Sequence, residues 1–246
     1  MIFLLPPSES KQAGKTRSPI SLSFSSLSGA RMLVQSALVA VSKDSAVAKK
    51  ALKLGPKQSA ELELNLALNK PKAVPAIDLY TGVLYDALKL DGLNKSERSR
   101  AKKLVYIQSS LFGLVSALDN IPSYRLSAGS KLPGINLRTI WSGAHQRVWE
   151  SFRAETVIDL RSKAYAQLAP LPEWIESYEV EVLSEDGSGV RKALNHFNKQ
   201  AKGSFVRAVL TSKVAPTKIS DLKKMAKLAG LNLETQGKTL LLITNA

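Results

Sequence analysis

Short apolar runs of β-prone residues recur along this chain, and longer stretches with helical periodicity separate them. Ile2–Leu5 and residues 156–160 (TVIDL) are apolar through most of their length, which is typical of strands buried on both faces. Residues 104–114 (LVYIQSSLFGL) open on a β-prone run, which predicts a central strand. Residues 177–183 (SYEVEVL) alternate between polar and apolar, as a half-exposed strand does. The order predicts a mixed-sheet α/β or α+β fold, in which helices flank a mixed central sheet.

Helical periodicity is clearest in three stretches. Residues 29–42 are expected to form a helix whose apolar face is Met32, Leu33, Ala37, Ala40 and Val41. Residues 136–152 place Leu137, Ile140, Trp141, Ala144, Val148, Trp149 and Phe152 at helical spacing. Residues 190–210 are predicted to form one long basic helix, and residues 231–244 a closing hairpin around Gln236-Gly237.

Length and composition restrict the class of protein. With 246 residues, of which 44% are hydrophobic, the chain can bury one substantial core, and we expect a single domain over residues 1–246. The sequence contains no cysteine, which excludes disulfides, thiolate zinc sites and thiol catalysis. Its two histidines have no spaced second ligand, so we expect no metal and no cofactor. No apolar stretch is long enough to cross a bilayer, which predicts a cytoplasmic protein without a membrane partner.

Positive charge is the strongest compositional signal. The formal net charge is +15, which favours a polyanionic partner such as double-stranded DNA over a merely basic protein. The charge is also sorted along the chain. Residues 95–103 carry five basic residues and one acid, residues 191–213 carry six basic residues and no acid, and residues 173–186 carry six acids and no base. This sorting predicts a one-sided electrostatic surface.

The N-terminal strand leads into a loop that ends in Gly14-Lys15-Thr16, as a P-loop would. A P-loop also needs a glycine at position 9, where this chain has Glu9, whose carboxylate would repel phosphate. Arg17-Ser18-Pro19 follows, and the residue before a proline disfavours helical geometry. The sequence therefore argues against a P-loop nucleotide hydrolase.

Five segments in a fixed order resemble the YaaA family of peroxide-stress resistance proteins. They are LLPPSESK (4–11), YTGVLYDAL (80–88), SSLFGLVSALDNIPSYRLSAG (109–129), DLRSKAYAQL (159–168) and NKQAKGSFVRAVL (198–210). The resemblance implies an elongated α/β domain with a positively charged cleft, DNA binding, and a part in limiting iron-driven oxidative damage. The chain departs from the family pattern in its longer first loop, at Ser127-Ala128, and at Asp159 and Arg161.

The resemblance also implies a helix–hairpin–helix element, which residues 80–104 match best. Turn amides near Gly92 and a helix capped by Asn94 or Ser96 would hold a phosphate. The usual second hairpin glycine is missing, though Asn94 can reach left-handed geometry at modest cost. Such a device binds without strong sequence preference. A capped surface helix with a solvated basic face is an equal alternative. The expected phosphate contacts are Lys11, Gly92, Asn94, Lys95, Arg98, Arg100, Lys102, Lys103, Arg125, Lys199, Lys202 and Arg207.

A second hypothesis is an enzyme that acts on a nucleotide or modified base, which leaves a small-molecule ligand possible. Its candidate cleft contains Ser8, Glu9, Tyr80, Tyr124, Ser162 and Tyr165, together with Lys11, Arg125 and Lys199. The loops that follow strand ends are where α/β sheets place ligands. The sequence contains no recognised catalytic triad, so phosphate binding or turn capping is the stronger interpretation. His145, between Trp141 and Trp149, is expected to be packed or hydrogen-bonded rather than a metal ligand.

Overall fold

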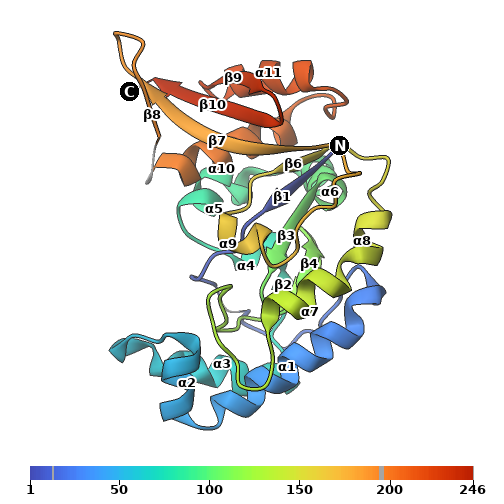
Figure 1. Cartoon of the computed structure of the whole chain (residues 1–246), viewed down its shortest axis with the longest axis vertical. Coiled ribbons are helices and arrows are strands. Elements are labelled where there is room, and N and C mark those ends of the chain that lie inside the picture. Colours follow the sequence, from blue (N-terminus) through green and yellow to red (C-terminus); the bar gives the residue numbers. More distant parts are fainter. Residues whose placement is uncertain (13, 194–196, 246) are drawn as a thin grey trace.

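A twisted mixed sheet forms the centre of the protein, as the sequence predicts (Figure 1). The structure is a computed structural model that describes residues 1–12, 14–193 and 197–245. The strands are β1 (Ile2–Leu5), β2 (Val74–Pro75), β3 (Val105–Ser109), β4 (Gly113–Ser116), β5 (Asn120–Ile121), β6 (Val157–Asp159), β7 (Ser177–Glu185), β8 (Arg191–Ala193), β9 (Asn232–Gln236) and β10 (Thr239–Asn245).

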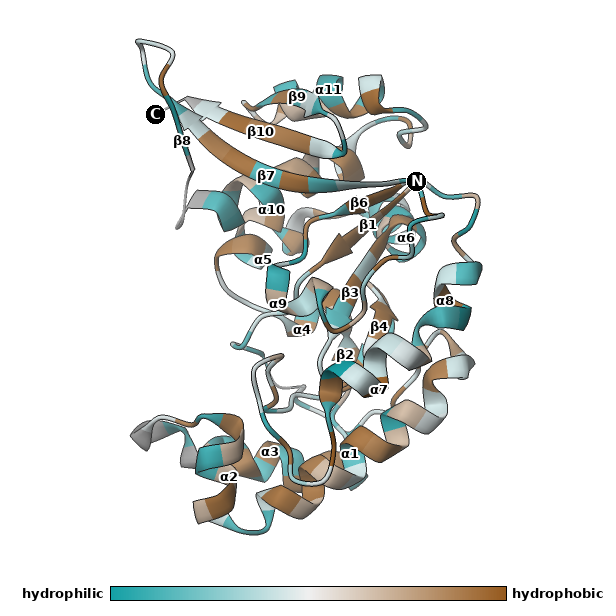
Figure 2. Cartoon of the chain, viewed as in Figure 1, coloured by the Kyte–Doolittle hydropathy of each residue, from teal (hydrophilic) through white to brown (hydrophobic). Residues whose placement is uncertain are grey.

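The sheet has the order β4-β3-β1-β6-β7-β10-β9, and β8 pairs with β7. Strands β3, β1, β6, β7 and β10 run parallel, whereas β4, β8 and β9 pair antiparallel. Strands β1 and β6 pair from Ile2 opposite Val157 to Leu4 opposite Asp159. All four residues of β1 are buried, which explains why its sequence is continuously apolar. Figure 2 shows this hydrophobic character along the inner strands.

Helices cover the sheet and extend beyond it to form the elongated lower part of the molecule in Figure 1. They are α1 (Ser28–Ser42), α2 (Ser45–Leu52), α3 (Leu62–Leu66), α4 (Ala76–Leu79), α5 (Val83–Leu88), α6 (Lys95–Leu104), α7 (Leu137–Ala144), α8 (Gln146–Glu150), α9 (Lys163–Ala166), α10 (Phe197–Thr211) and α11 (Ile219–Leu228). Short 3₁₀ turns lie at Ser25–Leu27, Pro56–Glu61, Ala67–Asn69 and Leu90–Gly92. No helix in the described residues is long and apolar enough to span a bilayer.

The predicted basic helix over residues 190–210 is wrong in its first part. Residues 191–193 form β8, and α10 is Phe197–Thr211. The strand is favoured because Arg191 pairs with Glu185 of β7 and with Glu234 of β9. The expected positions of Leu194 and His196 lie outside the described residues.

The predicted apolar face of α1 is only partly right, because Val41 is buried but Met32 and Leu33 are not. Met32 and Leu33 are 66% and 49% exposed, while Arg31, Val34 and Leu38 are buried. The guanidinium of Arg31 explains the difference because it donates to four backbone carbonyls. These acceptors belong to Phe112, Leu114, Ser23 and Phe24. Arg31 therefore lies on the buried face of α1, whereas the apolar residues Met32 and Leu33 lie on its exposed face.

The predicted helix over residues 136–152 is interrupted at His145, between α7 and α8. The imidazole is buried, as expected of a packed histidine. Its Nδ1–H donates to the Trp141 carbonyl at 2.7 Å, and its Nε2 accepts the Leu114 N–H at 3.2 Å. Burial lowers the pKa of His145 to about 3, so the ring is neutral.

Helix α10 packs closely on α5 through Gly203. A Cβ at this position would overlap the carbonyl oxygen of Leu84 and lie 2.8 Å from the Ala87 Cβ. The glycine thus allows the backbones of the two helices to approach each other, which holds α5 beside the ends of the central strands.

We expect Gly203→Ala to lower the free energy of unfolding by about 1–3 kcal/mol, because the overlap with Leu84 involves backbone that cannot yield. Gly143→Ala is the matched control: a Cβ there meets nothing within 4 Å, so the helix propensity of alanine should stabilise α7 by up to about 1 kcal/mol. Urea denaturation of both variants measures the difference. Equal stabilities would contradict the close approach.

Candidate functional site

A cavity of about 690 Å³ opens at the carboxyl ends of β1 and β6. Parallel neighbours bring the loops that follow them to the same edge of a sheet, and ligands bind there in open α/β sheets. Its walls come from six separate parts of the chain. The lining residues are Pro6, Pro7, Ser8, Glu9, Ser10, Lys53, Thr81, Gly82, Val83, Leu84, Tyr85, Ser127, Ala128, Gly129, Ser162, Ala164, Tyr165 and Lys199.

The structure brings together most of the residues of the expected cleft. Ser8, Glu9, Ser162, Tyr165 and Lys199 all line the cavity. Tyr80 and Tyr124, also expected there, are buried and do not line it.

The first loop is fixed in place by backbone contacts rather than left free. The Gln12 N–H donates to the Leu79 carbonyl at 2.7 Å, and the Thr81 N–H donates to the Ser10 carbonyl at 3.1 Å. The Tyr85 hydroxyl donates to the Pro6 carbonyl at 2.8 Å. These bonds hold the side chains of the loop against the cavity, as a preorganised site requires.

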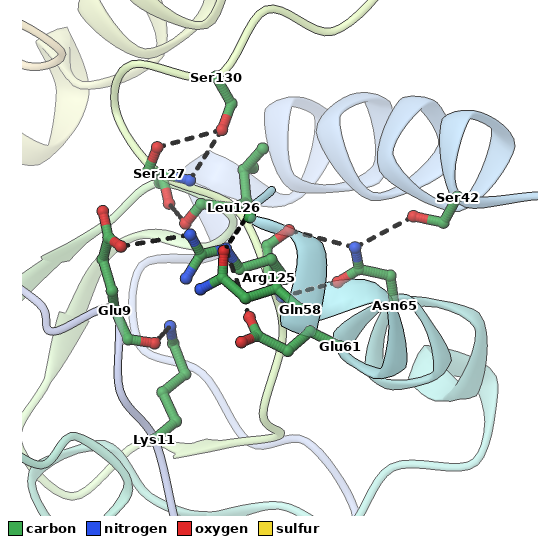
Figure 3. Close-up of polar contacts among 12 residues, drawn as sticks. Glu9, Lys11, Ser42, Gln58, Glu61, Asn65, Arg125, Leu126, Ser127 and Ser130 are labelled. Atoms are coloured by element: carbon green, nitrogen blue, oxygen red, sulfur yellow. Dashed lines mark hydrogen bonds and ion pairs between the residues drawn. The ribbon is translucent and has the colours of Figure 1, made fainter. Parts of the chain in front are cut away.

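Arg125 lies behind Glu9 and joins it to the helical part of the molecule (Figure 3). Its guanidinium contacts the carboxylate of Glu9 at 3.2 Å and that of Glu61 at 3.4 Å, and its side chain is only 8% exposed. Asn65, which is fully buried, accepts the Arg125 N–H at 2.8 Å and donates to the Arg125 carbonyl at 3.1 Å. The arrangement positions the Glu9 carboxylate, which is largely exposed, in the cavity wall.

Lys11 is half-buried beside this ion pair. Its Nζ donates to the Glu9 carbonyl at 3.1 Å and lies 4.4 Å from the centre of the Tyr124 ring. Burial is the main cause that lowers the pKa of Lys11 to about 7, and the positive charge of Arg125 is the second. The carboxylates of Glu9 and Glu61 oppose the shift. An amine with this pKa populates both its charged and its neutral form near neutral pH, whereas an ordinary lysine is almost entirely charged there.

Two tyrosines form a buried hydrogen-bonded chain below Lys11. The hydroxyls of Tyr80 and Tyr124 lie 2.9 Å apart, and Tyr124 lies 2.7 Å from Ser109 Oγ. Ser109 Oγ also accepts the backbone N–H groups of Leu111 and Phe112. Burial raises the pKa of both tyrosines, so they remain neutral hydrogen-bonding groups.

Asp159 and Arg161, at which the chain departs from the family pattern, neutralise each other. The Arg161 guanidinium contacts the Asp159 carboxylate at 2.7 Å and donates to the Ala169 carbonyl at 2.8 Å. The Arg161 side chain is almost fully buried, and neither residue lines the cavity. Asp159 and Arg161 therefore compensate each other's charge within the fold, whereas Ser127 and Ala128 lie in the cavity wall itself.

Several expected phosphate contacts are engaged within the protein. Arg98 pairs with Asp78, and Arg100 donates to the carbonyls of Leu210, Ser212 and Lys213. Arg207 donates to the carbonyls of Leu88 and Lys89 at the end of α5, and Lys202 is buried with its Nζ 3.3 Å from the Leu160 carbonyl. Lys95, Lys102 and Lys103 of α6 are exposed.

The turn before α6 is exposed at Gly92, but its amides have partners. The N–H groups of Gly92 and Leu93 donate to the carbonyls of Lys89 and Leu90, and that of Asn94 donates to Glu97. Asn94 caps α6, as expected, and does so in extended geometry rather than the left-handed geometry that it could reach. Lys89, the C-cap of α5, is the residue of this segment that adopts left-handed geometry.

Sequence reasoning missed Lys53, which reaches the cavity from the end of α2. It is the C-cap of that helix in left-handed geometry, and its Nζ lies 3.4 Å from a Cβ built at Gly129. Nothing in the local sequence distinguishes it from neighbouring exposed lysines. In the described part of the chain, no three His, Cys, Asp or Glu side chains are grouped so that they could hold a metal ion.

NMR titration of the lysine side chains tests the position of Lys11. We expect its ammonium to titrate near pH 7, well below the ordinary lysine value of 10.5. Glu9→Gln should lower that pKa further, because the variant removes a carboxylate that stabilises the charged form. A Lys11 resonance that titrates with the exposed lysines would contradict this environment.

The same shift predicts a pH dependence of stability. The folded state binds the Lys11 proton less tightly than the unfolded chain does, so this lysine opposes folding fully below pH 7 and progressively less up to about pH 10.5. The free energy of unfolding of Lys11→Met, relative to the parent, should therefore decrease as pH rises through that window. A pH-independent difference in urea titrations would contradict the shift.

Comparison with known proteins agrees with the segments identified in the sequence. The model of the family described as peroxide stress protein YaaA matches residues 1–236. A UPF0246 protein of Corynebacterium efficiens is 38% identical over 241 residues, which cover 95% of each chain. A UPF0246 protein of Streptomyces coelicolor is 36% identical over 249 residues, which cover 96% of this chain and 93% of the relative. The chain thus belongs to the YaaA family of peroxide stress proteins.

Proposed function

We propose that this protein acts in the peroxide-stress response by binding DNA, and that the cavity at the strand ends holds one nucleotide unit of the ligand. The observation that carries the proposal is the convergence of Ser8, Glu9, Ser162, Tyr165 and Lys199 on one cavity. Binding of this kind would shield DNA from iron-driven oxidative damage.

The composition of the cavity wall supports a nucleotide. Lys53 and Lys199 bring positive charge from two different helices, and the hydroxyls of Ser8 and Ser162 can donate to phosphate oxygens. The Glu9 carboxylate can accept the N–H groups at the edge of a base. A volume of about 690 Å³ is within the usual range for small-ligand sites.

Helix α6 offers contacts for a longer nucleic acid. Its exposed lysines, Lys95, Lys102 and Lys103, can neutralise phosphates without reading sequence. The arginines of the same segment are engaged within the protein: Arg98 pairs with the Asp78 carboxylate, and Arg100 holds backbone carbonyls at the end of α10. DNA affinity contributed by α6 should therefore depend on its lysines more than on Arg98 or Arg100.

A salt titration of duplex DNA binding tests the proposal. Affinity should fall steeply with salt, because each neutralised phosphate releases counterions. In the triple variant Lys95→Ala, Lys102→Ala and Lys103→Ala, the slope of log K against log salt should become shallower by up to about 2.7, or about 0.9 per contact.

The matched control replaces Lys223, Lys224 and Lys227 of α11, which are also exposed, by alanine. It removes the same formal charge from another helix. If the two triple variants weaken binding equally, the effect is one of net charge, and the assignment to α6 is wrong. If the parent protein does not bind duplex DNA at low salt, the DNA-binding proposal is wrong.

An enzyme that acts on a nucleotide or modified base is the second candidate. The contact of Arg125 with Glu9 and of Lys11 with the Glu9 backbone favours it, because a carboxylate and an amine with a pKa near 7 can move protons. The cavity supplies a place for the substrate beside the carboxylate.

Thermal unfolding in the presence of nucleotides and free bases tests this candidate. A compound that occupies the cavity should raise the midpoint, since it binds only the folded state. The increase should be smaller in Glu9→Gln, which removes the acceptor but keeps the shape of the side chain. If no compound shifts the midpoint, the second candidate is wrong.

A further inference from the structure

A second, apolar cavity lies away from the strand ends, where the chain passes from α10 into α11. It measures about 300 Å³ and is independent of the proposed nucleotide site, with which it shares no residue. The lining residues, here called the α10–α11 corner, are Ser212, Val214, Ala215, Thr217, Asp221, Lys224, Met225 and Leu228.

Two apolar side chains at this corner are unusually exposed. Val214 is 72% exposed and Leu228 is 77% exposed, and both line the same cavity. Asp221, Lys224, Met225 and Leu228 follow a helical spacing that places them on one face of α11. A large side chain from another molecule could fill the cavity and cover both exposed residues.

The corner is held rigidly although its surface is exposed. Arg100 donates to the carbonyls of Leu210, Ser212 and Lys213, which fixes the end of α10. The Ser212 hydroxyl lies 2.7 Å from the Val214 carbonyl. Val214 therefore needs little ordering on binding, which lowers the entropic cost of an interface.

The charge around the corner is positive. Five exposed lysines lie in the connection to α11 and in the helix itself, namely Lys213, Lys218, Lys223, Lys224 and Lys227. The one acid between residues 211 and 228 is Asp221, whose carboxylate accepts from Thr217 and Lys218 at the start of α11. The lysines would attract an anionic partner, and the Asp221 carboxylate is already hydrogen-bonded within the protein.

We propose that the α10–α11 corner docks an acidic peptide segment that carries one or two large apolar side chains. The apolar side chain would enter between Val214, Met225 and Leu228, and the acids would face the surrounding lysines. A peptide fits better than nucleic acid, because the apolar walls leave base edges without hydrogen-bond partners. It also fits better than a bilayer, because the apolar surface is concave rather than a continuous helix face.

Fluorescence anisotropy with labelled hexapeptides tests the proposal. One set combines three aspartates with one or two Leu or Phe residues, a second keeps the acids without apolar residues, and a third replaces the acids by lysines. Only the first set should bind, and its affinity should fall as salt increases.

The double variant Val214→Ser and Leu228→Ser should weaken binding of the first set about tenfold or more, because both substitutions remove apolar surface that the peptide would bury. Met32→Ser with Leu33→Ser is the matched control, since it removes two exposed apolar side chains from α1 and should leave binding unchanged. Both variants change exposed residues, so circular dichroism should show the parent fold. Lys224→Glu should weaken binding as well.

The proposal is overturned if no peptide of the first set binds, if the acid-only set binds equally well, or if the double variant binds like the parent. It is also overturned if the corner residues govern another association instead. In that case no peptide would bind, but the parent would bind vesicles with anionic lipid, duplex DNA or a second copy of the chain. Loss of that binding in the double variant would identify the partner.

Discussion

The parallel pairing of β1 with β3 and β6 determines where this protein can present a ligand site. Because the three strands point the same way, their carboxyl ends meet at one edge, and the loops after β1 and β6 become neighbours there. Ser8 and Ser162 thereby line one cavity although more than 150 residues separate them in the chain. The close approach of α10 at Gly203 then brings Lys199 to the same cavity.

Much of the positive charge has a structural use. Arg31, Arg100 and Arg207 each donate to several backbone carbonyls, and Arg161 is buried against Asp159. The planar guanidinium suits this task because it offers several donors in a fixed geometry and remains charged when partly buried. The formal charge of +15 therefore overstates the charge available to a polyanion, and the exposed lysines are the better guide to it.

The cavity at the strand ends and the α10–α11 corner differ in chemistry. The cavity at the strand ends combines cations, hydroxyls and a carboxylate, whereas the α10–α11 corner combines an apolar cavity with surrounding lysines. A protein with both could hold nucleic acid at one place and an acidic protein segment at another. Arg100 was expected to contact phosphate. It instead fixes the loop beside Val214 at the α10–α11 corner.

The sequence by itself determined the elements whose signals are local. Apolar runs located β1, β3 and β6, alternation located β7, and Asn94 marked the start of α6, which it caps. Placing Ser8, Glu9 and Ser162 after strand ends also predicted that they share a site. Tertiary structure alone decided that Arg31 occupies the buried face of α1, that residues 191–193 pair as a strand, and that Lys53 reaches the cavity. These outcomes depend on partners distant in the chain, chiefly carbonyls, carboxylates and neighbouring strands, and local periodicity carries no information about such partners.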